Sequence, residues 1–218
     1  MNQDKPWLNS YPEGVPHQVD GTQFESLNHL FAQALDQYSS RLAFDCMGKK
    51  ITYKELDELS WQFASYLQSS GLKKGDRIAL MMPNLLQYPI ALLGSLRAGC
   101  VVVNVNPMYT ARELAYQLND SGADALVILE NFAHVFQSIQ DQLPKDLGIW
   151  TIPGIDGTRI ASNDWKTQID ALPTQPNLNV DWQPGESIGA YIHSGGTTGV
   201  PKIVKITHRN MSFRHWTL

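Results

Sequence analysis

Hydrophobic positions along this sequence alternate between a helical spacing and short continuous runs. One helical stripe comprises Leu27, Leu30, Phe31, Ala34, Leu35 and Tyr38, and a second comprises Leu56, Leu59, Phe63, Tyr66 and Leu67. Residues three or four apart share one face of a helix, so each stripe predicts a helix with one buried side. Between such stripes lie runs such as RIALMM at residues 77–82. Near-continuous apolar runs are typical of strands buried on both faces of a sheet.

Polar residues mark where several of these helices begin and end. Thr52 precedes Glu55 by three residues, and Thr110 precedes Glu113 by the same interval. Each pair predicts a capping box, in which the two side chains satisfy each other's free backbone amides at a helix start. Gly71 follows the helix that begins after Thr52, at the position where a left-handed residue commonly ends a helix.

The same alternation continues along the chain. The segment RLAFDCMGKKITY predicts a hairpin with Gly48 in its turn. Further helices are predicted at roughly residues 88–98, 111–120 and 132–143, and further strands at 100–103, 123–129 and 149–152. Pro89 then falls in the first turn of its helix, where proline is tolerated. The sequence therefore predicts an α/β fold, with a layered, mostly parallel sheet flanked by helices.

The organisation changes after this region. We expect residues 1–152 to form a subdomain of alternating helices and strands. Residues 153–185 are rich in proline and glycine and predict a surface connection, with a short helix at about 165–172. Residues 186–218 predict a strand, SIGAYIH, a loop, a second strand, IVKIT, and a helix capped by Thr207.

Composition narrows the classes of function. The chain has 218 residues, is 43% hydrophobic and carries a formal net charge of −4, which argues against disorder and against broad binding to nucleic acid. Its two cysteines, Cys46 and Cys100, form no metal or redox motif, and this favours a reducing compartment. The N-terminus lacks an apolar signal core, and the most apolar region, residues 78–103, is interrupted too often for a membrane span.

The loop HSGGTTGVPK, residues 193–202, carries the candidate chemistry. Three glycines let the backbone approach a ligand and turn its N–H groups inward, while hydroxyls and one lysine add further donors. That set of groups suits a polyphosphate, and it also suits an ordinary hairpin connection. The residues concerned are Ser194, Gly195, Gly196, Thr197, Thr198, Gly199 and Lys202.

Other nucleotide and catalytic motifs do not match this loop. A Walker A loop needs Ser or Thr after the lysine, where this chain has Ile203, and the dinucleotide pattern GxGxxG is absent. The GxSxG nucleophile elbow is also absent, so Ser194 is a poor candidate nucleophile. His193, His208 and His215 lack metal-ligand spacing, and we interpret them as structural or solvated.

The stretch SGGTTGVPK resembles the phosphate-binding signature of the adenylate-forming, or AMP-binding, superfamily. A longer segment, from Lys73 to Ile128, resembles bacterial long-chain fatty-acid–CoA ligases, as do WLNSYPEGVP at residues 7–16 and THRNM at 207–211. The resemblance implies that the chain is the incomplete N-terminal part of the large adenylate-forming domain. Two positions depart from the family pattern: Ile203 replaces a glycine, and His193 replaces a tyrosine or another aromatic residue.

The resemblance implies an acid–thiol ligase that uses ATP, Mg²⁺ and coenzyme A. A fatty acid would form acyl-AMP, and coenzyme A would then displace AMP. Residues 194–199 and Lys202 would hold the phosphates, with Ser194 also near Mg²⁺. We expect no catalytic residue within this chain and no activity from it alone, because the family's later segments supply the adenine site, an acidic Mg²⁺ ligand, the acyl tunnel and the catalytic lysine.

Two other readings stay open at this stage. The chain could be a non-catalytic module that binds a nucleotide or a partner through an unpaired sheet edge. The acid could instead be an aryl or medium-chain one, as Ile203 suggests. The resemblance implies a cytoplasmic protein and allows peripheral association with the inner membrane face and a homodimer.

Overall fold

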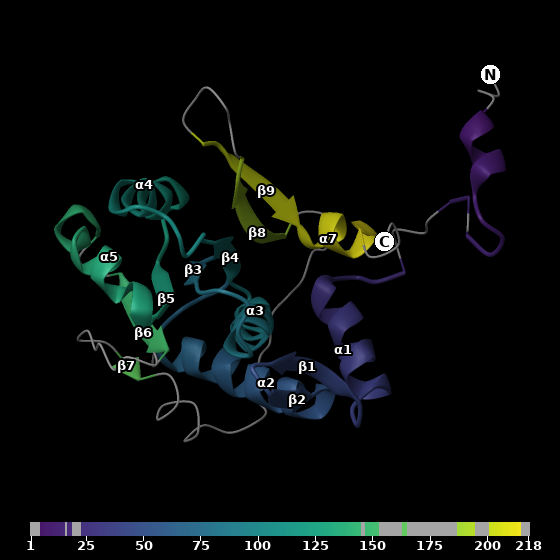
Figure 1. Cartoon of the computed structure of the whole chain (residues 1–218), viewed down its shortest axis with the longest axis horizontal. Coiled ribbons are helices and arrows are strands. Elements are labelled where there is room, and N and C mark those ends of the chain that lie inside the picture. Colours follow the sequence, from purple (N-terminus) through teal and green to yellow (C-terminus); the bar gives the residue numbers. More distant parts are fainter. Residues whose placement is uncertain are drawn as a thin grey trace.

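The computed structural model describes residues 5–15, 17–18, 23–144, 147–152, 163–164, 187–194 and 201–214 (Figure 1). The helical elements are η1 (Pro6–Ser10), α1 (Leu27–Gln37), α2 (Tyr53–Ser69), α3 (Gln87–Arg97), α4 (Ala111–Ser121), η2 (Glu130–Phe132), α5 (Ala133–Gln137), η3 (Gln140–Gln142) and α7 (His208–Arg214). The strands are β1 (Leu42–Cys46), β2 (Lys49–Thr52), β3 (Arg77–Met81), β4 (Val101–Asn104), β5 (Ala125–Leu129), β6 (Gly148–Ile152), β7 (Asn163–Asp164), β8 (Ile188–His193) and β9 (Ile203–Thr207).

A seven-stranded sheet forms the centre of the molecule, in the order β7-β6-β5-β3-β4-β8-β9. Every neighbouring pair is parallel except β8 and β9, which form an antiparallel hairpin. The mostly parallel sheet expected from the sequence is therefore confirmed. The division of the chain at residues 152 and 185 stays a prediction, although β8 pairs with β4 and so continues the same sheet.

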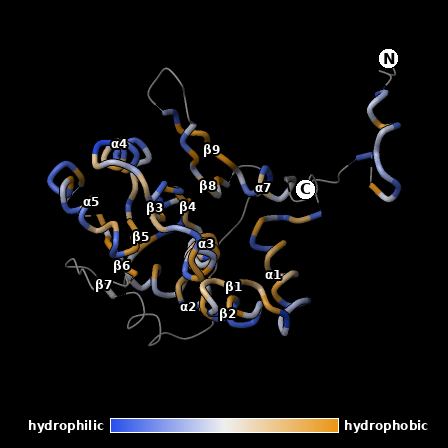
Figure 2. Tube along the Cα trace, in the orientation of Figure 1, coloured by the Kyte–Doolittle hydropathy of each residue, from blue (hydrophilic) through white to orange (hydrophobic). Residues whose placement is uncertain are grey.

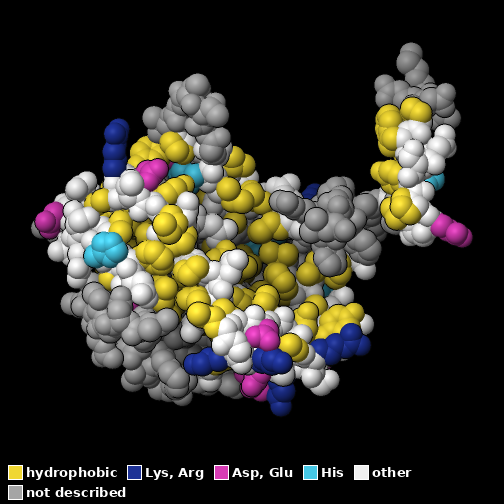
Figure 3. Space-filling model, viewed as in Figure 1, with side chains coloured by type: hydrophobic (Ala, Val, Ile, Leu, Met, Phe, Trp, Pro, Cys, Tyr) yellow, Lys and Arg dark blue, Asp and Glu magenta, His cyan; other side chains and the backbone are white. Residues whose placement is uncertain are grey.

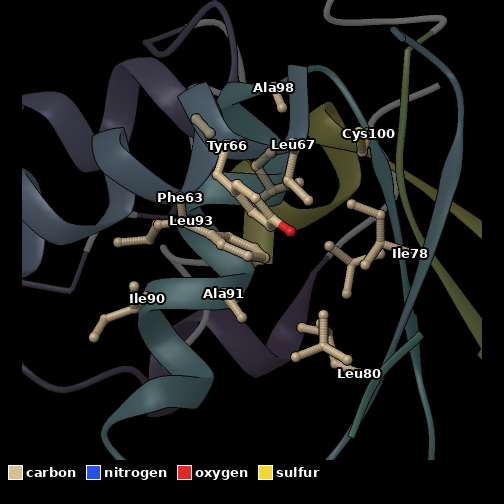
Figure 4. Close-up of a cluster of buried hydrophobic side chains, with 14 of the residues drawn as sticks. Phe63, Tyr66, Leu67, Ile78, Leu80, Ile90, Ala91, Leu93, Ala98 and Cys100 are labelled. Atoms are coloured by element: carbon tan, nitrogen blue, oxygen red, sulfur yellow. The ribbon is translucent and has the colours of Figure 1, made fainter. Parts of the chain in front are cut away.

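Helices cover both faces of this sheet, as the continuous apolar strands require. Ile78 and Leu80 of β3 pack into a cluster with α2 and α3, whereas Ala79 and Met81 pack into a second cluster with α4 and α5. Figure 2 shows hydrophobic and hydrophilic residues alternating along the helices, and Figure 4 shows Phe63, Leu67 and Leu93 gathered over the strand residues Ile78 and Leu80. The alternation along β3 gives each helical layer its own core.

The predicted helix caps are present. The Thr52 backbone N–H donates to Oε2 of Glu55 at 2.7 Å, and the Glu55 N–H donates back to the Thr52 hydroxyl at 3.2 Å. Thr110 and Glu113 form the same capping box at the start of α4. Gly122 ends α4 with a φ of 59°, a left-handed conformation that glycine adopts at little cost.

A separate two-stranded sheet, β1–β2, confirms the predicted hairpin. Its turn places Gly48 at a φ of 78° and Met47 at a φ of 53°. Two consecutive left-handed residues are typical of the tight turns that match strand twist.

The predicted continuous helix over residues 132–143 is wrong. The structure has only the short helix α5, between the 3-10 turns η2 and η3. No side chain caps the start of α5, and the backbone leaves the helical region at Ile139. Phe136 and Ile139 are buried in the core beneath the sheet, so packing determines the path of this segment rather than helix propensity. The helix expected at about 165–172 lies outside the described residues.

Candidate functional site

The candidate loop rises from a hairpin whose neck is closed by hydrogen bonds. His193 of β8 pairs with Ile203 of β9. Beyond this pair, the Ser194 N–H donates to the Lys202 carbonyl oxygen at 2.9 Å, and the Lys202 N–H donates to the Ser194 hydroxyl at 3.2 Å. The predicted hairpin between two neighbouring strands is thus confirmed, and Ser194 and Lys202 lie together at its neck. The other predicted site residues, Gly195, Gly196, Thr197, Thr198 and Gly199, lie outside the described residues.

This neck lies at the carboxyl end of β8. Because β8 runs parallel to β4, the carboxyl end of β4 at Asn104 lies on the same edge of the sheet. Ligands of open α/β sheets bind outside the carboxyl ends of the strands. The hairpin is therefore at the edge where a nucleotide site is expected.

The side chain of His193 is buried, with only 3% of it exposed, and it contacts α4. Its Nε2 lies 3.2 Å from Oδ2 of Asp120, and its Nδ1 lies 3.0 Å from Nε2 of Gln117. The Tyr116 ring meets the imidazole edge-on, with centroids 6.4 Å apart. The structural interpretation of His193 fits these contacts.

The α4 residues that surround His193 were not among the predicted site residues. One signal was available, because Gln117 lies between Leu114 and Leu118 on the apolar face of α4. Gln117 is only 2% exposed, and a buried amide requires polar partners. One partner is the Asn104 carbonyl oxygen, which accepts a hydrogen bond from Nε2 at 2.8 Å.

A cleft of about 670 Å³ lies between α4 and the hairpin. It is lined by Tyr109, Thr110, Arg112, Glu113, Tyr116, Gln117, His193 and Pro201. Figure 3 shows charged side chains mainly toward the rim of the molecule, with hydrophobic and uncharged ones filling the centre of this face. The cleft therefore lies next to the neck of the loop, and its lining includes aromatic rings and one cation, Arg112.

The part of the chain that the structure describes contains no cluster of three or more His, Cys, Asp or Glu side chains suited to a metal ion. Mg²⁺ in nucleotide sites keeps water and phosphate oxygens as most of its ligands, so a single hydroxyl is a compatible protein contribution. Ser194 is exposed, and its hydroxyl accepts the Lys202 N–H while retaining its own proton and a lone pair. Its assignment as a residue near Mg²⁺ stays a prediction.

His208 belongs to the packing of the fold. Its side chain is fully buried, and the Leu27 N–H at the start of α1 donates to its Nδ1 at 3.4 Å. Burial lowers the pKa of His208 to about 4, which keeps the ring neutral. Within the described residues, no helix has the length and apolar character needed to cross a bilayer.

Comparison with known proteins places this fold and loop in one family. Residues 31–218 match the family model described as AMP-binding enzyme. The long-chain-fatty-acid–CoA ligase of Escherichia coli O157:H7 is 43% identical over an alignment of 230 residues. The alignment covers 95% of this chain and 41% of that relative. The chain therefore spans well under half the length of the curated relatives that it matches most strongly.

Solved structures agree in fold. An anthranilate–CoA ligase in complex with anthranoyl-AMP has a TM-score of 0.80 at 20% identity, covering 88% of this chain and 37% of that one. A long-chain-fatty-acid–CoA ligase from Archaeoglobus fulgidus has a TM-score of 0.77 at 25% identity, covering 93% and 40%. With a family match over residues 31–218, the resemblance first seen in the loop and in the segment from Lys73 to Ile128 is confirmed, and this chain belongs to the AMP-binding enzyme family.

Proposed function

We propose that this chain is the N-terminal portion of a long-chain fatty-acid–CoA ligase and that its loop, residues 194–202, binds the phosphates of ATP. The observation that carries the proposal is the closed neck of the β8–β9 hairpin. It places the hydroxyl of Ser194 beside the backbone of Lys202, at the carboxyl edge of a parallel sheet. Relatives named as long-chain-fatty-acid–CoA ligases support the substrate class.

The reaction would begin with attack of a fatty carboxylate on the α-phosphate of ATP. Pyrophosphate would leave, and the thiol of coenzyme A would then displace AMP from acyl-AMP. The difficulty of the first step is the approach of one anion to another. Fixed dipoles and cations near the phosphates lower that repulsion and stabilise the charge on the departing group.

Several residues of this chain would lower the repulsion between the carboxylate and the phosphates, each from its own place in the loop. Backbone N–H groups of residues 195–199 would point at phosphate oxygens, and Lys202 would add a mobile positive charge. Mg²⁺, when bound, would neutralise further phosphate charge beside the Ser194 hydroxyl. Because Lys202 is exposed, its ammonium group is free to reach a ligand above the neck.

Orientation of both reactants is a large share of catalysis, and a phosphate loop orients only the nucleotide. We therefore expect the 218-residue chain to bind nucleotide without forming acyl-CoA. Fatty-acid-dependent exchange of pyrophosphate into ATP by the purified chain would contradict this expectation.

An aryl or medium-chain acid is the alternative substrate class. It is favoured by Ile203, which stands directly after Lys202 where the fatty-acid ligase pattern has glycine. The structure places Ile203 at the start of β9, paired with His193. Comparing fatty, medium-chain and aryl acids in pyrophosphate exchange by the longer ligase that contains this sequence would decide between the classes.

Calorimetric titration with Mg·ATP tests the phosphate site in this chain. Lys202→Ala should weaken binding by about ten- to a hundred-fold, because a hydrogen bond to a charged group contributes roughly 1.5–3 kcal/mol. Lys205→Ala is the matched control, since Lys205 is also an exposed lysine of the hairpin but lies on β9, away from the loop. Equal affinities for the wild type and the Lys202 variant would remove Lys202 from the site. A wild-type chain that binds no nucleotide would contradict the phosphate site proposed for this chain.

A further inference from the structure

Helix α4 contacts both ends of the candidate phosphate loop. On the β8 side, Asp120 is hydrogen-bonded to His193, which immediately precedes Ser194. On the β9 side, the hydroxyl of Tyr116 donates to the carbonyl oxygen of Pro201 at 3.0 Å, and Pro201 immediately precedes Lys202. The two contacts come from residues one helical turn apart on the same helix, and they flank the loop at its base.

Gln117 determines how the His193 ring is oriented. The Asn104 carbonyl oxygen can only accept, so the Gln117 amide nitrogen must face it. The second N–H of that amide then donates to Nδ1 of His193. The remaining ring nitrogen, Nε2, carries the proton and donates it to Asp120. One chain of hydrogen bonds therefore joins the end of β4 to the base of the loop.

The sheet itself supports the hairpin only in part. Pairing between β4 and β8 involves Ala190 and Tyr191 and does not extend to His193. Beyond Tyr191, the described hydrogen bonds that join the hairpin to the body of the protein come from α4. Partial removal from water raises the pKa of the Tyr116 hydroxyl, and the charge of Asp120 and a side-chain hydrogen bond with it raise that pKa further. A phenol is protonated at neutral pH even without such a shift, so this hydroxyl is a donor.

We propose that Tyr116, Gln117 and Asp120 are positioning residues, which hold the two ends of the loop in the register that its phosphate-binding groups require. None of them needs to touch the nucleotide. Their effect reaches it through His193 and Pro201, which set the positions of Ser194 and Lys202. The part of the proposal that concerns nucleotide affinity rests on the proposed function, whereas the part that concerns the loop does not.

These hydrogen bonds explain why this chain has His193 where the family usually has a tyrosine or another aromatic residue. A phenylalanine at this position would keep the edge-on contact with Tyr116 and lose both hydrogen bonds. His193→Phe should therefore release the β8 end of the loop while α4 and the sheet stay folded.

Hydrogen–deuterium exchange of the 218-residue chain, followed by mass spectrometry without nucleotide, tests the proposal directly. Tyr116→Phe and Asp120→Ala should each speed exchange in peptides covering residues 194–202 by roughly five-fold, the factor expected for one lost hydrogen bond. The double variant should exceed either single one. Exchange in α4 should stay unchanged in all three.

Two controls remove the same chemical groups from places that have no described side-chain hydrogen bond to the hairpin. Tyr109→Phe deletes a hydroxyl from the same cleft, one that has no hydrogen-bond partner among the described residues. Asp141→Ala deletes one exposed carboxylate from η3. Both should exchange as the wild type does. If Tyr116→Phe and Asp120→Ala match these controls, or if α4 exchanges faster together with the loop, the positioning role is overturned.

Mg·ATP titration of the same variants separates the two proposals. Each positioning variant should weaken binding by roughly two- to ten-fold. If the wild type binds no ATP and the exchange differences are nevertheless present, the positioning of the loop stands and the nucleotide assignment fails. If the variants bind ATP as tightly as the wild type, positioning for phosphate binding is overturned.

Discussion

Gly94 of α3 lies against Phe63 of α2 so closely that no side chain fits between them. A Cβ atom on Gly94 would lie 2.7 Å from Cδ1 of Phe63 and 2.8 Å from the backbone oxygen of Ser60. Because one of these neighbours is backbone, a small side-chain movement would not relieve the contact. This approach allows α2 and α3 to pack together over one face of the sheet (Figure 4).

Gly94→Ala should therefore destabilise the protein by about 2 kcal/mol, the usual cost of overpacking a close-packed core. At an exposed helical site the same change would stabilise by about 1 kcal/mol. Urea unfolding followed by circular dichroism measures the difference. Phe63→Leu should cost less in the Gly94→Ala background than in the wild type. A variant as stable as the wild type would contradict the close approach.

Arg97 joins α3 to α2 through a buried guanidinium. It donates to Oδ1 of Asp57 at 2.6 Å and to the hydroxyl of Ser60 at 2.8 Å, and it lies over the ring of Trp61. Burial lowers the pKa of Arg97, and Asp57 opposes that shift.

Asp57→Asn should cost about 2 kcal/mol or more of unfolding free energy, because it leaves a buried cation without its counter-charge. Glu58→Gln, at the exposed pair with Lys54 on the same helix, should cost less than about 0.5 kcal/mol. Equal losses in the two variants, measured by urea unfolding, would argue against a structural role for the pair of Asp57 with the buried Arg97.

The two thiols should differ sharply in reactivity. Burial raises the pKa of Cys100 to about 12, and the charges of Asp76 and Asp124 add to this shift. Cys46 is partly exposed. Since the thiolate is the reactive form, a disulfide reagent at pH 8 should label Cys46 in the native chain and reach Cys100 only on unfolding. Cys46→Ser should abolish the fast phase, whereas Cys100→Ser should leave it intact. Two fast-reacting thiols in the folded wild type would be the opposite result.

Stability should fall in mild acid through His208. Its pKa is about 4 in the folded protein, below the value of 6.5 expected for an unfolded chain. The unfolded state therefore binds the proton more readily, so this stabilisation is complete above about pH 6.5 and is lost as pH falls through about 4. His208→Gln should flatten the slope of unfolding free energy between these values. His134→Gln, at an exposed position, should not. If the slope of unfolding free energy against pH is unchanged in the His208 variant, groups other than His208 cause the acid sensitivity.

Much of the fold was predictable because its signals are local. The capping boxes at Thr52 and Thr110 join residues three apart, and the turn at Gly48 needs only a left-handed backbone. The apolar stripes predicted which helix faces are buried. The prediction failed at residues 132–143, where no cap fixes the helix start and the burial of Phe136 and Ile139 decides the path.

For the candidate site too, some features were predictable from the sequence and others only from the tertiary structure. Composition and motif alone marked Ser194, Lys202 and the glycine-rich loop between them, and they identified the family through a resemblance spread along the chain. Only the tertiary structure connected that loop to α4, because Asp120 and His193 are 73 residues apart and Tyr116 and Pro201 are 85 apart. Contacts of this kind depend on strand order, which places β8 beside β4 and so brings the hairpin to α4. The sequence by itself determined what the loop is made of, and the order of strands in the sheet decided what holds it in place.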